Sequence, residues 1–271
     1  MKKPMRWTLL TVILLGAAPV AAGTDPDGGA FDRANALAIS QAAIGHRVSD
    51  HTFQTVHGTT RSLAELRGKP LVVSLIYTSC YHICPATTQH LAKAVKKARD
   101  VLGDDSFHVL TVGFDVPNDG PDAMRVFAAQ QSVDVSGWDF VSADQPTIDA
   151  LTRELGFQYF PSPTGFDHLI QSSILDADGT VFRQVYGIQF ETPHLIEPLK
   201  VLVFGEDSTA GLLDQITDRI RLFCTVYDPA SDSYRFDYSI FIGLVMGLVL
   251  GTLAVYLLIR EWRHTRRAAG V

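Results

Sequence analysis

The sequence predicts an α/β protein with a mostly parallel sheet flanked by helices and one C-terminal transmembrane helix. Residues 70–77 form a nearly continuous apolar run, which is typical of a strand buried on both faces. Such runs alternate with segments whose apolar residues recur at helical spacing, and this alternation favours a parallel sheet. Residues 240–259 carry no charge, and a helix of that length is about 30 Å long, the thickness of the hydrocarbon core of a bilayer.

In the first half of the globular part, helices and strands are predicted from glycine and proline breaks and from the spacing of apolar residues. Residues 46–66 are expected to form short strands and turns before the buried strand at 70–77. A helix is expected over residues 84–102, where apolar residues recur at helical spacing until Gly103 ends it. The next expected elements are a strand at 107–115, a helix at 121–131, a short strand at 138–141 and a helix from 146 to about 156.

The second half is expected to add an antiparallel edge. Residues 159–167 read as a loop, and 170–175 and 181–185 as a hairpin around the turn at 176–179. Further helices are expected at about 192–204 and 208–223. Because a cysteine pair follows the first long buried strand, the predicted fold is thioredoxin-like.

The N-terminal segment has the organisation of a secretory signal peptide. A basic start is followed by a short apolar run at 7–16 and by small residues at 20–22, which predicts cleavage after Ala22. An uncleaved anchor is the alternative. The small-residue cleavage site favours a bacterial envelope, and residues 23–45 read as a flexible lead-in that has room for a helix around 31–43.

The C-terminal segment predicts the topology. Four arginines and one glutamate occupy residues 260–271, directly after the uncharged span, so the positive-inside rule places this tail in the cytoplasm. The globular part then lies in the periplasm of a single-pass bacterial inner-membrane protein, as the signal peptide independently requires. The predicted parts are a globular domain at 46–205, a juxtamembrane helix and linker at 206–239, the transmembrane helix at 240–259 and the basic tail at 260–271.

The charge of the exported part excludes one class of partner. The chain carries −6 overall, while residues 1–22 and 260–271 each carry +3, which leaves −12 on residues 23–259. An acidic domain repels phosphate, so nucleic acid is an unsuitable partner. The same charge suits a cationic partner or a metal ion.

Cys80 and Cys84 are the predicted functional centre. Cys80 lies in the turn before a helix and Cys84 near the start of that helix, where the unpaired amides and the helix dipole favour a thiolate. Their spacing brings both sulfurs to one helix face, where they can form a disulfide or bind one metal ion. The Cys-x3-Cys spacing is wider than the Cys-x2-Cys of common oxidoreductases and favours a metal. We expect this turn to be exposed.

Two thiolates select soft metal ions, and a third ligand is expected from elsewhere in the chain. Among the nine histidines, His168 is the best candidate. It opens the predicted hairpin, and in a thioredoxin-like sheet that region faces the cysteine turn.

Other polar residues are given structural interpretations. His82, between the cysteines, is interpreted as solvated in preference to a ligand, because adjacent ligands rarely point the same way. The spacing of His46, His51 and His57 matches no known ligand pattern. Asp115 and Asp119 are interpreted as surface turn residues in preference to an acidic docking rim, and Asp176 to Gly179 as a hairpin turn. Cys224 is interpreted as a packed side chain, with a reactive thiol or an intermolecular disulfide as alternatives. Gly243, Gly247 and Gly251 line one face of the span, which suits a partner helix.

The residues around the cysteines resemble those of a known family. Ser79-Cys80-Tyr81-His82-Ile83-Cys84-Pro85 is similar to the Cys-x3-Cys-Pro motif of the Sco/SenC family. The flanking Gly68-Lys69-Pro70 and Tyr77-Thr78 fit that family as well, and so does Asp167-His168 followed by Leu175-Asp176-Ala177-Asp178-Gly179. The resemblance covers roughly residues 45–205.

The resemblance implies a thioredoxin fold and a copper site. Cys80 and Cys84 would be thiolate ligands, and also a redox-active pair able to form a disulfide, while His168 would be an imidazole ligand. The implied role is to deliver copper to the CuA centre of cytochrome c oxidase, or to reduce its cysteines. Family members commonly carry one N-terminal anchor, whereas this sequence predicts a signal peptide and a C-terminal span.

Three functions remain open at this point. The first is a copper-binding assembly factor that does not turn over, with the CuA subunit, other copper chaperones and thiol reductants as partners. The second is an enzyme, a membrane-tethered thiol–disulfide reductase in which Cys80 attacks and Cys84 resolves. The third, a peroxidase or redox sensor, requires a base or arginine beside one cysteine, and no such motif is visible. The sequence leaves the oxidation state of the copper open.

Overall fold

The computed structural model describes residues 31–133, 135–205, 225–228, 233–236 and 238–268. The predicted signal peptide, residues 23–30 of the lead-in, the predicted helix at 208–223 and Cys224 lie outside the described residues. The helices of the globular part are α1 (Arg33–Ala42), the short η1 (Ala64–Leu66), α2 (Ile83–Leu102), α3 (Pro121–Gln131), α4 (Gln145–Glu154) and α5 (Pro193–Phe204).

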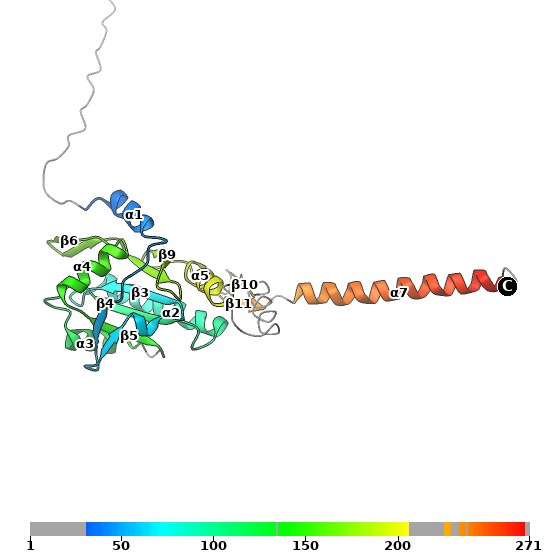
Figure 1. Ribbon diagram of the computed structural model, residues 1–271, viewed down its shortest axis with the longest axis horizontal. Helices are drawn as coiled ribbons and strands as arrows, with labels where there is room; N and C mark the ends of the chain where they lie inside the picture. Colours follow the sequence, from blue (N-terminus) through cyan, green and yellow to red (C-terminus); the bar gives the residue numbers. More distant parts are fainter. Residues whose placement is uncertain (1–30, 134, 206–224, 229–232, 237, 269–271) are drawn as a thin grey trace, which may run out of the picture. The chain divides into compact units, whose positions relative to one another are not determined.

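The main sheet of the described part has a parallel centre and antiparallel edges. Its strands are β1 (Thr52–Thr55), β2 (Thr60–Ser62), β3 (Leu71–Ile76), β4 (His108–Gly113), β5 (Trp138–Ser142), β8 (Gln171–Leu175) and β9 (Val181–Tyr186). They lie in the order β2-β1-β5-β4-β3-β8-β9. Figure 1 shows β3, β4, β5 and β9 of this sheet among the helices of the globular part. The neighbours β3, β4 and β5 run parallel, while β1 pairs antiparallel with β5 and β8 antiparallel with β3.

The centre of this sheet is buried on both faces. Every residue of β3 and β8 is buried, which confirms the prediction from the apolar run at 70–77. Helix α2 covers the sheet with a buried apolar stripe that includes Leu91, Val95 and Ala98, and it packs against α3 and α5. Gly103 follows α2 with φ +103°, a conformation that glycine adopts without strain. The predicted α/β fold with a central parallel sheet is therefore confirmed.

The prediction of a loop at residues 159–167 is wrong. The segment forms a second, two-stranded sheet, β6 (Tyr159–Ser162) paired antiparallel with β7 (Gly165–His168). Aromatic side chains hold this hairpin onto the core, since the rings of Tyr159 and Phe166 lie 4.7 and 5.4 Å from the ring of Phe114. The two prolines and the glycine suggested irregular backbone, but ring packing determines the structure.

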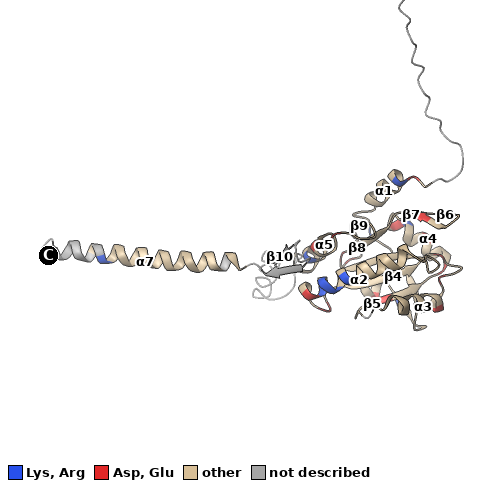
Figure 2. Cartoon of the chain, turned by 180° about the vertical axis from the view of Figure 1, so that it is seen from behind, with Lys and Arg blue, Asp and Glu red and all other residues tan. Residues whose placement is uncertain are grey.

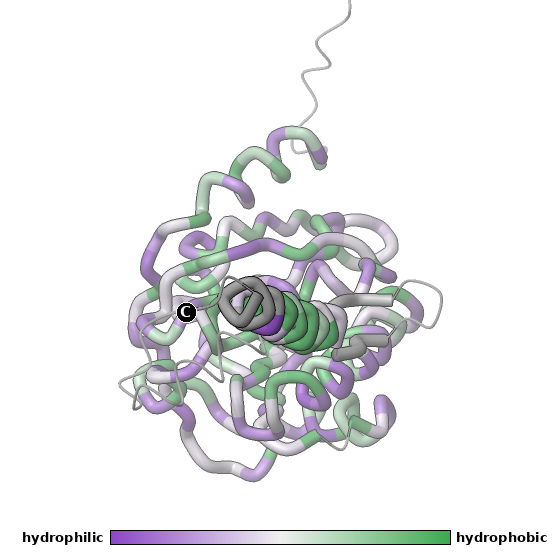
Figure 3. The backbone as a smooth tube through the Cα atoms, turned by 90° about the vertical axis from the view of Figure 1, so that its right-hand side faces the viewer, coloured by the Kyte–Doolittle hydropathy of each residue, from purple (hydrophilic) through white to green (hydrophobic). Residues whose placement is uncertain are grey.

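In the described part of the chain, a strand pair and a long helix follow the globular part. Strands β10 (Thr225–Asp228) and β11 (Ser233–Phe236) pair antiparallel within the stretch predicted as juxtamembrane linker. Helix α7 (Ser239–Ala268) contains a segment, Ile242–Arg260, that is long and apolar enough to cross a membrane. Figure 2 shows α7 without charge along this segment until its end, and Figure 3 shows its apolar colouring.

Candidate functional site

Cys80 and Cys84 meet at the turn between β3 and α2. The strand ends at Ile76, and the helix begins at Ile83. The backbone amide of Cys84 donates a hydrogen bond to Cys80 Sγ at 3.2 Å, so the four-residue spacing brings both cysteines to one side of the helix start, as predicted. Both are free thiols.

The expectation that this turn exposes its cysteines is wrong. Cys80 is 9% exposed and Cys84 is 3% exposed, whereas Tyr81 between them is 84% exposed. The loop turns its two sulfurs toward the core, and Tyr81 and His82 face solvent. His82 occupies the N-cap of α2 without a side-chain capping bond, which agrees with its interpretation as a solvated residue.

The two thiols are electrostatically unlike. The side-chain hydrogen bond from Cys84 lowers the pKa of Cys80 to about 5, against an opposing effect of burial. Backbone amides of Cys84 and His82 and the hydroxyl of Tyr77 add to this lowering. The same hydrogen bond between the two thiol groups, together with burial, raises the pKa of Cys84. At neutral pH the pair therefore holds one thiolate, on Cys80, and one proton, on Cys84.

Tyr77 is a member of the site that the sequence analysis did not single out. Burial and the hydrogen bond to Cys80 raise the pKa of its phenol to about 12, so it stays a neutral donor. It lies directly after β3, three residues before Cys80. Tyr77 could have been predicted as a site residue, because a tyrosine directly after a buried strand places its hydroxyl where it needs a hydrogen-bond partner.

His168 ends β7 and faces the same region. Its Nδ1 is 2.7 Å from the carbonyl oxygen of Leu169, which accepts only, so Nδ1 carries the proton and Nε2 keeps its lone pair. Burial lowers the pKa of His168, which keeps the ring neutral near pH 7. A neutral imidazole with one nitrogen fixed by a backbone carbonyl is the form that binds metal ions.

Ring contacts bring His168 toward the cysteine loop. Its ring lies 6.1 Å from Tyr77, 5.6 Å from Phe114 and 5.3 Å from Phe157. Gly165 permits the hairpin to approach, because a Cβ at this position would lie 2.6 Å from the hydroxyl oxygen of Tyr77. His168 is near enough to Cys80 for the charge of that thiolate to raise its pKa slightly against the effect of burial.

The three predicted ligands lie in the same region of the molecule but do not form a closed coordination set. Among the described residues, no three His, Cys, Asp or Glu side chains are close enough together to hold a metal ion. The chemistry of the donors nevertheless fits copper, since two sulfurs and a neutral imidazole nitrogen are soft to intermediate ligands. The two cysteines already lie together at the start of α2.

The prediction that Asp115 and Asp119 are surface turn residues is wrong. Both are buried, and Asp119 is only 1% exposed. Asp119 Oδ1 accepts hydrogen bonds from the amide and the hydroxyl of Thr78, both at 2.7 Å. The segment after β4 folds back under the cysteine loop, where two backbone amides and the Thr78 hydroxyl satisfy the carboxylate.

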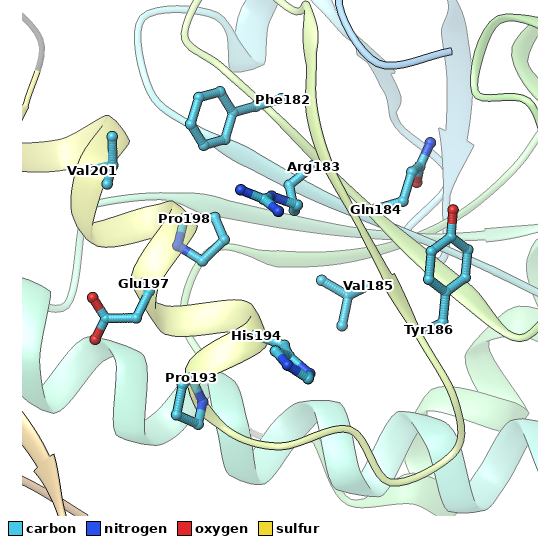
Figure 4. A pocket seen from close by; sticks show the side chains of 10 residues that line it. All are labelled: Phe182, Arg183, Gln184, Val185, Tyr186, Pro193, His194, Glu197, Pro198 and Val201. Atoms are coloured by element: carbon cyan, nitrogen blue, oxygen red, sulfur yellow. The ribbon is translucent and has the colours of Figure 1, made fainter. Parts of the chain in front are cut away.

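The remaining candidates have structural roles. His51 Nε2 lies 2.8 Å from Glu154 Oε2, while His46 and His57 are exposed. Asp176 accepts hydrogen bonds from the amides of Asp178 and Thr180, which confirms the hairpin turn. A hollow of about 550 Å³ lies between β9 and α5. Its lining residues include Val185, His194 and Pro198 (Figure 4). None of the predicted ligands lines it.

Known proteins resemble this chain over the globular part. The SCO1/SenC family model matches residues 41–203. The SCO1 protein homolog of Bacillus subtilis (strain 168) is 28% identical over 155 residues, which are 56% of this chain and 79% of that protein.

Two of the solved structures that share the fold illustrate the likeness. One is BsSco, described as a member of the Sco family of cytochrome c oxidase assembly proteins, with a TM-score of 0.54 and 23% identity over 60% of this chain and 96% of that chain. The other is Bradyrhizobium japonicum ScoI with copper bound, with a TM-score of 0.50 and 18% identity over 58% of this chain and 99% of that chain. These likenesses confirm the predicted fold class.

Proposed function

The chain belongs to the SCO1/SenC family, and from this premise we propose that it binds copper as cargo for the assembly of cytochrome c oxidase. The finer proposal is that it delivers this copper to the CuA centre of the oxidase. The copper-bound ScoI and the description of BsSco as an oxidase assembly protein support the proposal by kinship. The ligands proposed for this chain are Cys80, Cys84 and His168.

One observation carries the proposal: the two cysteines meet at one strand-to-helix turn, where the amide of Cys84 donates a hydrogen bond to Cys80 Sγ at 3.2 Å. Cys80 binds copper without first losing a proton, because the bond from Cys84 lowers its pKa to about 5. Cys84 keeps its proton until the metal displaces it, so loading releases a proton from this thiol. Two adjacent sulfurs make the site selective for a soft ion, and copper(I) is the softest of the common candidates.

His168 completes the set in this proposal. Its Nε2 carries the free lone pair, while the bond from Nδ1 to the carbonyl of Leu169 fixes the ring. Because the three side chains do not form a closed metal site among the described residues, loading requires His168 and the cysteine loop to come closer together.

The proposed placement is the periplasmic side of a bacterial inner membrane. The apolar segment of α7 supports a C-terminal anchor, and the arginines after it favour a cytoplasmic tail. We propose residues 1–22 as the signal peptide, 46–205 as the copper-binding domain, 206–239 as its juxtamembrane connection and 260–271 as the cytoplasmic tail. This arrangement holds the site near a membrane-bound oxidase and limits its search to two dimensions.

A thiol–disulfide reductase is the second candidate function, and the unlike thiols favour it. The Cys80 thiolate would attack a disulfide of the client and release one client thiolate. Cys84, after losing its proton, would then attack Cys80 Sγ, release the second client thiolate and leave a Cys80–Cys84 disulfide. An external dithiol reductant would restore the pair. In this function His168 has no ligand role.

Copper titration of the full-length chain in detergent separates the two functions. We expect the parent to bind one copper ion, with Cys80→Ser and Cys84→Ser losing more than about 100-fold in affinity, beyond the loss typical of an outer-shell change. His168→Ala should lose at least about tenfold, or about 1.4 kcal/mol. If His168→Ala binds copper as tightly as the parent, the three-ligand site is wrong and the reductase becomes the better reading.

A further inference from the structure

One carboxylate holds the cysteine loop from outside the cysteine motif. Asp119 Oδ1 accepts two hydrogen bonds from Thr78, which lies two residues before Cys80. Asp119 itself belongs to the segment between β4 and α3, and Thr78 to the segment between β3 and α2. These bonds therefore join two loops that are 41 residues apart in the chain.

Asp119 is itself held in place. Its Oδ2 accepts a hydrogen bond from the amide of Asp115 at 2.9 Å, and its own amide donates to the carbonyl of Asp115 at 2.8 Å. Gly113 leaves the room that this arrangement needs, because a Cβ there would lie 2.5 Å from Cβ of Asp119. Hydrogen bonds and packing therefore hold the Asp119 carboxylate in one position next to the cysteine loop.

Asp119 is a buried carboxylate whose oxygens are satisfied by hydrogen-bond donors. Asp119 is almost fully buried, and the ion pairs found among the described residues do not include it. A buried carboxylate is unfavourable unless hydrogen bonds satisfy it. Here amide and hydroxyl donors do so, and bonds to an ionised acceptor are shorter and stronger than those to a neutral one.

We propose that Asp119 is a positioning residue for the copper site. It fixes the segment from Thr78 to Cys80 so that Cys80 Sγ faces Cys84 before any metal arrives. The inference rests on the proposed function, because it assigns the tether to the same site. Partners that orient metal ligands typically contribute 10–100-fold to metal affinity, and a preorganised ligand loses less freedom on binding.

Glu154 provides a matched control. It is also a carboxylate that accepts three hydrogen bonds, from the amide and hydroxyl of Ser49 at 2.9 and 2.6 Å and from His51 at 2.8 Å. It therefore ties a loop to α4 in the way that Asp119 ties the cysteine loop. Neither Ser49 nor His51 belongs to the cysteine motif, so removal of Glu154 should affect stability without affecting the sulfurs.

The test compares variants of the full-length chain in detergent by copper(I) affinity, by the reduction potential of the Cys80–Cys84 pair and by melting temperature. We expect Asp119→Ala to weaken copper binding by about 10–100-fold and to shift the reduction potential. Asp119→Asn keeps an oxygen for Thr78 and should recover part of the affinity. Glu154→Ala should lower the melting temperature but change neither of the other two quantities.

Either of two results overturns the inference: Asp119→Ala matches the parent in affinity and potential, or Glu154→Ala loses as much as Asp119→Ala. If Asp119→Ala does not fold, Thr78→Val decides the question, because it removes only the hydroxyl bond to Asp119. Its loss of copper affinity should be smaller than the loss expected for Asp119→Ala. A parent that binds no copper refutes the proposed function instead. The reduction potentials then still decide whether Asp119 positions Cys80.

Discussion

The sulfur half and the imidazole half of the candidate site are built in different ways. Cys80 and Cys84 lie four residues apart at one strand-to-helix turn, and a local hydrogen bond joins them. His168 lies at the end of a two-stranded hairpin and reaches the region through ring contacts with Tyr77, Phe114 and Phe157. The sulfur half is thus organised by local structure and the imidazole half by tertiary packing, so the two should respond to different substitutions.

The largest effect is expected for the thiolate of the sulfur half. In the parent, the alkylation rate of Cys80 should rise with pH through about 5 and be level at neutral pH. Cys84→Ala removes the strongest contribution to the lowered pKa, so the pKa of Cys80 should rise toward about 8.5. At pH 6 its alkylation should then be at least about tenfold slower, since each pKa unit changes the thiolate fraction about tenfold. Mass spectrometry of the labelled peptide measures the rate at Cys80 alone.

Tyr77→Phe is the control for this measurement. Tyr77 contributes less than Cys84 to the lowered pKa of Cys80, so the shift should have the same direction and a smaller size. An unchanged pH profile in Cys84→Ala would show that the sulfur pair does not share its proton in the way described.

A smaller effect is expected from a change to the imidazole half. Gly165 has φ +125°, and a side chain there meets the Tyr77 hydroxyl. Gly165→Ala should lower the free energy of unfolding in urea by about 1–3 kcal/mol, the usual cost of such backbone strain, and should displace the hairpin. The alkylation profile of Cys80 should stay close to that of the parent.

Gly187→Ala is matched to this change. Gly187 has φ +103° but no heavy atom within 4 Å of the added Cβ, so it tests backbone strain without the clash. It should destabilise the chain less than Gly165→Ala. Equal losses would argue against a tight approach of the hairpin to Tyr77.

The smallest effect concerns pH and His168. Burial lowers its pKa below the value of about 6.5 in the unfolded chain, so the unfolded state binds more protons in this range. The contribution of the neutral ring to stability is present above pH 6.5 and is lost as the pH falls through the folded pKa. His168→Phe keeps a ring in the cluster and should flatten the dependence of the unfolding free energy on pH below 6.5. An unchanged slope would contradict the burial of a neutral imidazole.

The sulfur half was largely predictable from the sequence because its determinants are local. The apolar run, the turn and the helical repeat predict, to within a residue or two, where Cys80 and Cys84 lie relative to the end of the strand and the start of the helix. The burial of both sulfurs was not predictable, because it depends on the exposed Tyr81 and His82 taking the outer side of the loop.

The supporting parts of the site were harder to predict because their contacts are distant in the chain. Asp119 read as an ordinary turn residue, since nothing in the sequence shows that Thr78 donates to it across 41 positions. The hairpin that ends at His168 read as a loop because Pro161, Pro163 and Gly165 outweighed the aromatic residues between them. His168 itself was identified from ligand chemistry and from the resemblance to a known family.

X-ray absorption at the copper edge of the full-length chain loaded with copper(I) tests the central claim most directly, because it counts the ligands of the bound ion. If Cys80, Cys84 and His168 bind it together, the parent shows two sulfur ligands and one imidazole nitrogen, and His168→Ala keeps both sulfurs and loses the imidazole signal. A parent with fewer than two sulfur ligands, or a His168→Ala variant that retains the imidazole signal, would contradict the account.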